Sequence, residues 1–136
     1  HKSFLIDVIG LLRSNGMRVS LFIDPEPELP YLAKEVGADR VEIYTGPYGG
    51  AFERMAMERE FRKVVETGKA AERAKVGLNA GHDLTRENLP RLVAALPILL
   101  EVSIGHAITS DALLFGMAET VRLFRKACGD LRSEAA

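Results

Sequence analysis

The chain contains one cysteine, Cys128, and no tryptophan among its 136 residues. A single cysteine excludes a disulfide within the chain and fits a reducing compartment. No run of apolar residues approaches the roughly 18 that a membrane-spanning helix requires. The formal net charge is −1, so the chain has no overall electrostatic attraction to nucleic acid or to a membrane. Together these absences predict a cytoplasmic protein with neither kind of partner.

What the sequence does contain is a regular alternation of two hydrophobic periodicities, one typical of strands and the other of helices. The predicted strands are residues 18–24, 40–46, 76–82 and 100–106. The predicted helices are residues 4–12, 29–36, 51–74, 88–95 and 111–128. Strands joined by helices must run parallel, because each crossover returns the chain in the same direction. The last four residues, 133–136, are predicted to be frayed.

The faces of the predicted strands distinguish between the two architectures that fit this order, an open doubly wound sheet and a (β/α)₈ barrel. One face is apolar, with residues such as Val41 and Ile43, and the other carries polar residues such as Ser20, Glu42 and Ser103. A polar inner face suits the interior of a barrel. A complete barrel needs eight strands and about 250 residues. The sequence therefore predicts an α/β fold in which residues 1–136 form a single domain, half of a (β/α)₈ barrel.

Two of the predicted strands end in the same dipeptide, Gly81-His82 and Gly105-His106. Ligands of α/β folds bind at the carboxyl ends of the strands. Glycine allows backbone N–H groups to approach an anion closely, and a following helix adds partial positive charge. A histidine there can donate to phosphate or transfer a proton near neutral pH. The repeated motif indicates a shared phosphate site, whereas either copy alone would read as an ordinary turn.

Glu42 lies on the polar face of the second predicted strand. A carboxylate inside a barrel is costly unless it is paired or used as an acid or base. The sequence leaves two interpretations open, a catalytic role and an internal ion pair with a residue such as Arg18. Glu101, further from the strand ends, is interpreted as structural and paired. Residues 45–50, rich in glycine, are read either as a flexible cover over the site or as an ordinary connection.

Several chemistries find no support in the sequence. It contains no cluster with metal-ligand spacing, no nucleophile elbow, no Walker loop and no dinucleotide-binding fingerprint. The sequence therefore gives no support for a metal site or for these chemistries.

The strand ends resemble those of the pyridoxine 5′-phosphate synthases. The segments that carry this resemblance are Val19-Ser20-Leu21-Phe22-Ile23-Asp24, Val41-Glu42-Ile43-Tyr44-Thr45-Gly46, Leu78-Asn79-Ala80-Gly81-His82-Asp83-Leu84 and Ser103-Ile104-Gly105-His106-Ala107-Ile108. The resemblance implies the C-terminal half of a (β/α)₈ barrel and a homo-oligomer. It implies a transferase-type synthase without a cofactor, which condenses 1-deoxy-D-xylulose 5-phosphate with 3-amino-2-oxopropyl phosphate. The products of that vitamin B6 reaction are pyridoxine 5′-phosphate, phosphate and water.

The same resemblance implies roles for five residues. His82 corresponds to a proton-transfer group and Glu42 to a glutamate that supports the transition state. Gly105 and His106 correspond to the pair that binds the phosphate of the amino-ketone. Asp83 occupies a further contact position at which some members have glycine; a contact made there by the backbone amide would not depend on the side chain.

The family's other catalytic groups have no counterpart in these residues. A second catalytic histidine, a catalytic glutamate and the arginines that hold the sugar phosphate belong to the first half of the family's chain. Two alternatives to the synthase stay open on the sequence: another phosphate-binding barrel enzyme, such as an isomerase or aldolase, and a non-catalytic half-barrel that binds phosphate.

Overall fold

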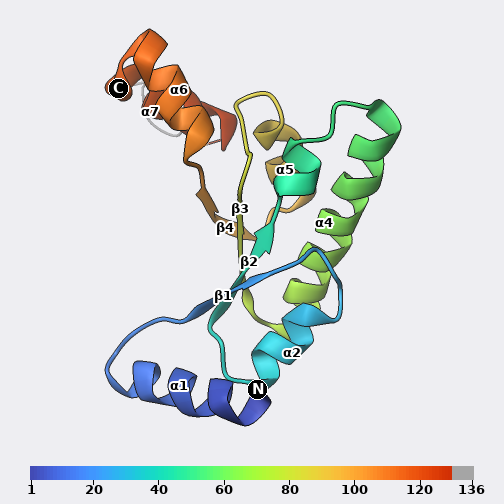
Figure 1. Cartoon of the computed structure of the whole chain (residues 1–136), viewed down its shortest axis with the longest axis vertical. Helices are drawn as coiled ribbons and strands as arrows, with labels where there is room; N and C mark the ends of the chain where they lie inside the picture. The colour runs from blue at the N-terminus through green and yellow to red at the C-terminus, as the bar shows by residue number, and fades with distance from the viewer. Residues whose placement is uncertain (130–136) are drawn as a thin grey trace.

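The computed structural model describes residues 1–129 and contains a four-stranded parallel sheet (Figure 1). Its strands are β1 (Ser20–Ile23), β2 (Arg40–Tyr44), β3 (Gly77–Gly81) and β4 (Leu99–Ser103). They lie side by side in sequence order, and each pairs in parallel with the next. All four predicted strands are confirmed, each shorter than predicted. The tail predicted to fray, residues 133–136, lies outside the described residues.

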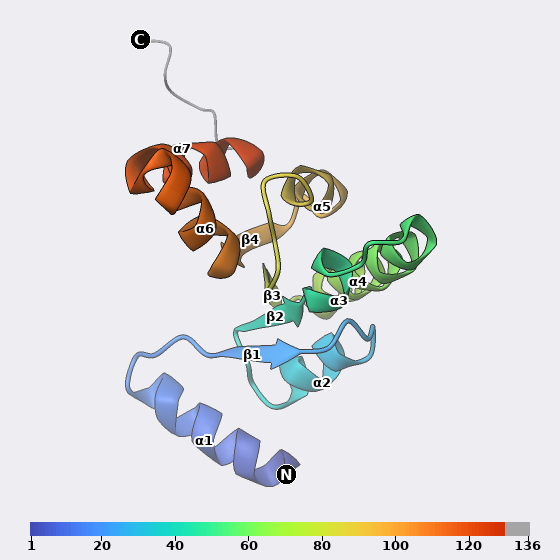
Figure 2. The ribbon, with the colours of Figure 1, turned by 45° about the horizontal axis from the view of Figure 1, so that its top comes forward.

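The helices fall into a covering layer and two outlying groups. They are α1 (Lys2–Ser14), α2 (Leu29–Glu35), α3 (Gly46–Gly49), α4 (Arg54–Ala74), α5 (Leu89–Ala95), α6 (His106–Phe115) and α7 (Met117–Ala127). Helices α2, α4 and α5 lie along one face of the sheet, with α1 at one end of the molecule and α6 and α7 at the other (Figures 1 and 2). Within residues 1–129, none of these helices combines the length and apolar character needed to cross a bilayer.

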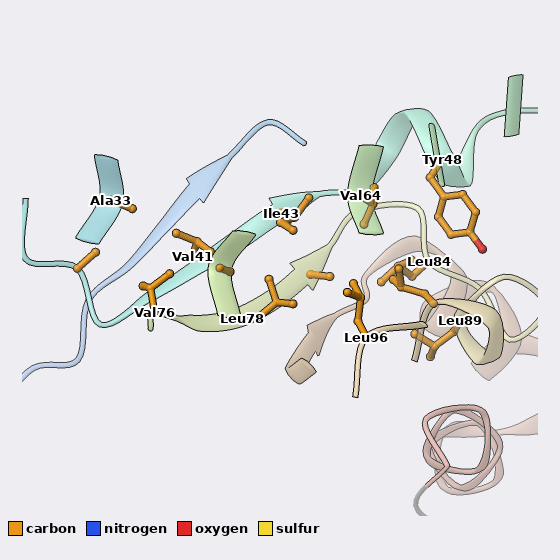
Figure 3. Packing of buried hydrophobic residues seen from close by; sticks show 14 of the residues in the cluster. Ala33, Val41, Ile43, Tyr48, Val64, Val76, Leu78, Leu84, Leu89 and Leu96 are labelled. Atoms are coloured by element: carbon orange, nitrogen blue, oxygen red, sulfur yellow. The ribbon is translucent and has the colours of Figure 1, made fainter. Parts of the chain in front are cut away.

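The core lies between that helical layer and the apolar face of the sheet. Val41, Ile43 and Leu78 are fully buried and belong to one cluster with Val64 of α4 and with Leu96 (Figure 3). Removing each such side chain from water stabilises the fold by about 1.5–3 kcal/mol. On the opposite face, Ser20 of β1 and Ser103 of β4 are exposed and Glu42 of β2 is half-buried. The predicted division into an apolar and a polar face is therefore confirmed.

The prediction of one helix over residues 111–128 is wrong. Helix α6 begins at His106, and the chain breaks at Gly116 before α7 starts. Gly116 has φ 78°, a left-handed conformation that ends a helix and that glycine adopts without a side-chain clash. The apolar pattern continues through this position, so periodicity alone did not reveal the break.

Residues 45–50 form a connection between β2 and α4, which is one of the two interpretations that the sequence left open. Residues 46–49 form the short helix α3, and the Tyr48 side chain is only 2% exposed. The Tyr48 hydroxyl donates to the backbone carbonyl of Asn88 at 2.8 Å. An aromatic ring buried in this way anchors the connection between β2 and α4 to the turn that follows β3.

The exit of β3 is a turn in an unfavourable backbone conformation. His82 has φ 90° and Asp83 has φ 54°, values that side-chain-bearing residues rarely adopt. Thr45, fully buried at the end of β2, supports this turn. Its backbone N–H donates to the Gly81 carbonyl at 2.8 Å, and its hydroxyl lies 2.7 Å from the carbonyl oxygens of both Gly81 and His82.

We expect Thr45→Val to destabilise the protein by about 1–3 kcal/mol, because it removes the only side-chain donor to these carbonyls within residues 1–129 while keeping the shape of the side chain. Thr45→Ser, which keeps the hydroxyl, is the matched control and should cost less. Chemical denaturation of the full-length protein measures both. Equal stability of the valine variant and the wild type would contradict the supporting role.

A second prediction concerns Gly49, because a Cβ there would overlap the Asp83 carbonyl oxygen. We expect Gly49→Ala to destabilise the protein by about 1–3 kcal/mol, since backbone atoms have to shift. The matched control is Gly10→Ala within α1, where no atom lies within 4 Å of the added Cβ. That change should instead stabilise by about 0.5–1 kcal/mol. The midpoint temperature of thermal unfolding should fall in the Gly49→Ala variant and rise in the Gly10→Ala variant.

Candidate functional site

An open hollow of about 630 Å³ lies where the strands end, on the face of the sheet away from the helical layer. Its lining residues are Phe22, Glu42, His82, Asp83, Ser103, Ile104, Gly105, His106 and Thr109. They lie on β1, β2 and β4, in the turns that follow β3 and β4, and in the first turn of α6. The five residues that the sequence singled out as a site, Glu42, His82, Asp83, Gly105 and His106, all line this one hollow.

His82 is held by its neighbours on both sides of the ring. The edge of the imidazole faces the Tyr44 ring, with centroids 4.9 Å apart and an angle of 82° between the planes. Nδ1 lies 3.1 Å from Oδ2 of Asp83. A carboxylate in this place favours the proton on Nδ1, which leaves Nε2 to face a ligand. The His82 backbone N–H donates to the Ser103 carbonyl at 3.4 Å and ties the turn to β4.

His106 is the first residue of α6, and Gly105 is the residue that precedes the helix. The N–H groups of the first turn of a helix have no partner within the helix and point toward its N-terminal end. No atom lies within 4 Å of a Cβ placed on Gly105, so the space above this backbone is open. The His106 side chain is 92% exposed, and its ring centroid lies 6.4 Å from that of His82. This arrangement suits the binding of an anion.

Asp83 brings the two histidines into one cluster. Its Oδ2 is close to His82, while its Oδ1 lies 3.8 Å from Nδ1 of His106. The side chain is 39% exposed and therefore reaches the hollow. The sequence left open whether Asp83 acts through its backbone. In the structure its backbone supports the turn, since its carbonyl accepts from the Asn88 amide at 3.1 Å, while its carboxylate contacts both imidazoles.

Glu42 projects from β2 into the same hollow. Within residues 1–129 it has no cationic partner at ion-pair distance, so the alternative of a pair with Arg18 is wrong. Arg18 instead lies 3.9 Å from Glu101, which also pairs with Arg40 at 3.0 Å. The interpretation of Glu101 as a paired structural residue is therefore confirmed. A Cβ on Gly81 would overlap Oε1 of Glu42, so the glycine makes room for this carboxylate.

Four lining residues were not singled out from the sequence as site residues: Phe22, Ser103, Ile104 and Thr109. Phe22 is 61% exposed on β1 and stacks at a tilt against Tyr44, 5.6 Å between centroids. Ser103 and Thr109 line the hollow from the end of β4 and from α6. The alternation of side chains along a strand places Phe22 on the polar face, because Phe22 is two residues from both Ser20 and Asp24. Phe22 could therefore have been found from the sequence. Thr109 could not have been found in this way, because it lines the hollow only since α6 begins at His106, earlier than the sequence predicted.

The chemistry available in the hollow is that of an anion site beside a proton-transfer site. Among the lining residues there is no lysine or arginine, so the donors for an anion are the two imidazoles, the Ser103 hydroxyl and the backbone N–H groups near Gly105. Within residues 1–129, no three His, Cys, Asp or Glu side chains converge as metal ligands would. The carboxylates of Glu42 and Asp83 supply acid–base groups at the same place.

Comparison with known proteins agrees with this chemistry. A family model described as pyridoxal phosphate biosynthesis protein PdxJ matches residues 1–130. A pyridoxine 5′-phosphate synthase of Rhizobium meliloti is 56% identical, with 94% of this chain and 52% of the relative covered. Its counterpart in Agrobacterium fabrum is 51% identical, with 98% of this chain and 54% of the relative covered.

One solved structure with a remote likeness was also found. A chain of the Amycolatopsis orientalis BexX/CysO complex aligns with a TM-score of 0.49 at 17% identity, over all of this chain and 55% of that one. This is too distant to inform the function. The chain spans about half the length of the curated relatives it matches. The match to the family model extends over nearly every residue, and the chain therefore belongs to the PdxJ family of pyridoxal phosphate biosynthesis proteins.

Proposed function

We propose that these residues supply half of the active site of a pyridoxine 5′-phosphate synthase. The reaction condenses 1-deoxy-D-xylulose 5-phosphate with 3-amino-2-oxopropyl phosphate to pyridoxine 5′-phosphate, phosphate and water. The observation that carries the proposal is the meeting of Glu42, His82, Asp83, Gly105 and His106 in one hollow at the strand ends. Membership of the PdxJ family and the names of the relatives support the same activity.

His82 is the proton-transfer group of the proposed reaction. Ring closure with loss of water and phosphate requires protons to be removed from carbon and nitrogen and delivered to leaving oxygen. An imidazole does both near neutral pH. The contact of Nδ1 with Asp83 and the edge contact with Tyr44 fix the ring, so that Nε2 faces the substrate.

Gly105 and His106 hold the phosphate of the amino-ketone in this proposal. The start of α6 offers backbone donors and the positive end of the helix dipole. Glu42, on the neighbouring wall of the hollow, supports positive charge that develops in the transition state, and a carboxylate without a cationic partner is available for that purpose.

We further propose that residues 1–136 form a single domain that is the C-terminal half of a (β/α)₈ barrel. The sequential order of parallel strands with helices on one face supports this. Both edges of the sheet are flanked by apolar hollows, one of about 600 Å³ beside β1 and α2 and one of about 300 Å³ beside β4 and α7. Further βα units would pack there. A homo-oligomer and a cytoplasmic location stay predictions.

The first prediction of the proposed function concerns His82. In the full-length protein, His82→Ala should lower kcat by about 10²–10⁴-fold, the usual contribution of a positioned acid or base. The control is His1→Ala, because His1 is an exposed residue far from the hollow along the chain. Steady-state formation of pyridoxine 5′-phosphate measures both. Near-normal turnover of the His82 variant would contradict its role.

The second prediction separates the synthase from its rivals. The full-length protein should convert the two named substrates, whereas residues 1–136 alone should form no product, because the remaining acids and bases lie in the other half of the barrel. Turnover of phosphosugar isomerase or aldolase substrates instead would favour another phosphate-binding barrel enzyme. Phosphate binding by the full-length protein without any turnover would favour a non-catalytic role. If residues 1–136 alone folded and formed product at the rate of the full-length protein, the proposal that they supply only half of the active site would be contradicted.

A further inference from the structure

Helix α6 carries His106 but is only lightly attached to the rest of the fold. No residue of α6 is buried. Near its start, Ala107 and Ile108 pack partly against the core, while Leu113 and Leu114 further along are 85% and 75% exposed. Within residues 1–129, apolar packing therefore holds α6 mainly near its start, and polar contacts further along the helix also contribute to the place of its first residue.

One ion pair attaches the middle of α6 to the turn that follows β3. Nε of Arg86 donates to Oδ2 of Asp111 at 2.5 Å, and the two side chains are 29% and 19% exposed. By comparison, the pairs of Arg40 with Glu101 and of Arg91 with Glu58 each include a side chain that is more than 40% exposed. The Arg86 guanidinium also lies 5.4 Å from the ring centroid of Phe115, at the end of the same helix. Arg86 thus contacts α6 at two points.

The turn that bears Arg86 is itself well fixed. Asn88 accepts from the Thr85 backbone N–H at 2.8 Å and donates to the Asp83 carbonyl at 3.1 Å. Leu84 is fully buried. Arg86 therefore stands on a rigid base only four residues after His82. The hydrogen bond with Asp111 raises the pKa of Arg86 above its ordinary value, so the guanidinium stays charged throughout the working pH range.

We propose that the Arg86–Asp111 pair is a positioning device that sets the place of His106 and Gly105 relative to His82. The pair joins the turn that presents the proton-transfer group to the helix that presents the anion donors. It thereby fixes the separation between the phosphate of a bound substrate and the reacting atoms. This inference rests on the proposed function for the identity of the substrate, but its effect on anion binding is measurable without turnover.

The test uses the full-length protein with Arg86→Gln, Asp111→Asn and the exchange Arg86→Asp/Asp111→Arg. Each single change should weaken binding of inorganic phosphate roughly tenfold, the scale of a few misplaced charge-assisted hydrogen bonds. Titration of inorganic phosphate, followed by NMR at the backbone amides of Gly105 and His106, measures this directly. The KM for 3-amino-2-oxopropyl phosphate should rise by a similar factor, with a smaller change in kcat. The exchange should restore most of both losses.

The matched control is Arg91→Gln. It breaks the pair of Arg91 with Glu58, which joins α5 to α4 away from the hollow at 2.7 and 2.8 Å. This variant tests for a general loss of stability and should leave phosphate affinity and KM unchanged. A positioning role requires the Arg86 and Asp111 variants to differ from it.

Phosphate affinities of the single variants within twofold of the wild type would overturn the proposal, as would an exchange variant no better than the single changes. Loss of phosphate binding in the Arg91 control to the same extent would overturn it too. The proposed synthase activity and the proposed positioning role of the ion pair can be contradicted independently of each other. Absence of product from the wild-type protein contradicts the synthase, whereas the phosphate titration tests the ion pair on its own.

Discussion

The parallel direction of all four strands is the constraint on which the site depends. Because each strand is followed by a helical return, every strand exit lies at the same edge of the sheet. Glu42, His82 and His106 are separated by 40 and 24 positions in the sequence, yet they line one hollow. The helices cover only the face of Val41 and Ile43, so the opposite face is free to bind a ligand.

The backbone at the exit of β3 is held away from its preferred conformation by its surroundings. Two consecutive side-chain-bearing residues, His82 and Asp83, have positive φ, at a cost of order 1–3 kcal/mol each. The hydrogen bonds of Thr45 and the close approach of Gly49 provide the support. A strained turn that neighbouring elements hold in place fixes the direction of its side chains more tightly than a relaxed turn would. This is the property that a proton-transfer group requires.

Much of this architecture was predictable, because it follows from local patterns. Periodicity located all four strands and their two faces, and the repeated Gly-His ends located the hollow. Longer-range geometry was not predictable. The break at Gly116 depends on a single backbone angle within an unbroken apolar pattern, and the ion pair of Arg86 with Asp111 depends on how two turns face each other. The role of Thr45 was hidden for the same reason, since its acceptors lie 36 and 37 positions away.

The charge balance of the hollow shows what the rest of a complete site has to supply. Glu42 and Asp83 are both acidic, and the lining residues include no lysine or arginine. The proposed substrates carry two phosphates between them, whereas the start of α6 with its imidazole accommodates one. A second phosphate placed near these carboxylates would be repelled unless cations faced it from another element. The open side of the hollow, where Phe22 and His106 are exposed, is the direction from which such cations can reach it. The half-barrel proposal thus has an electrostatic reason as well as a topological one.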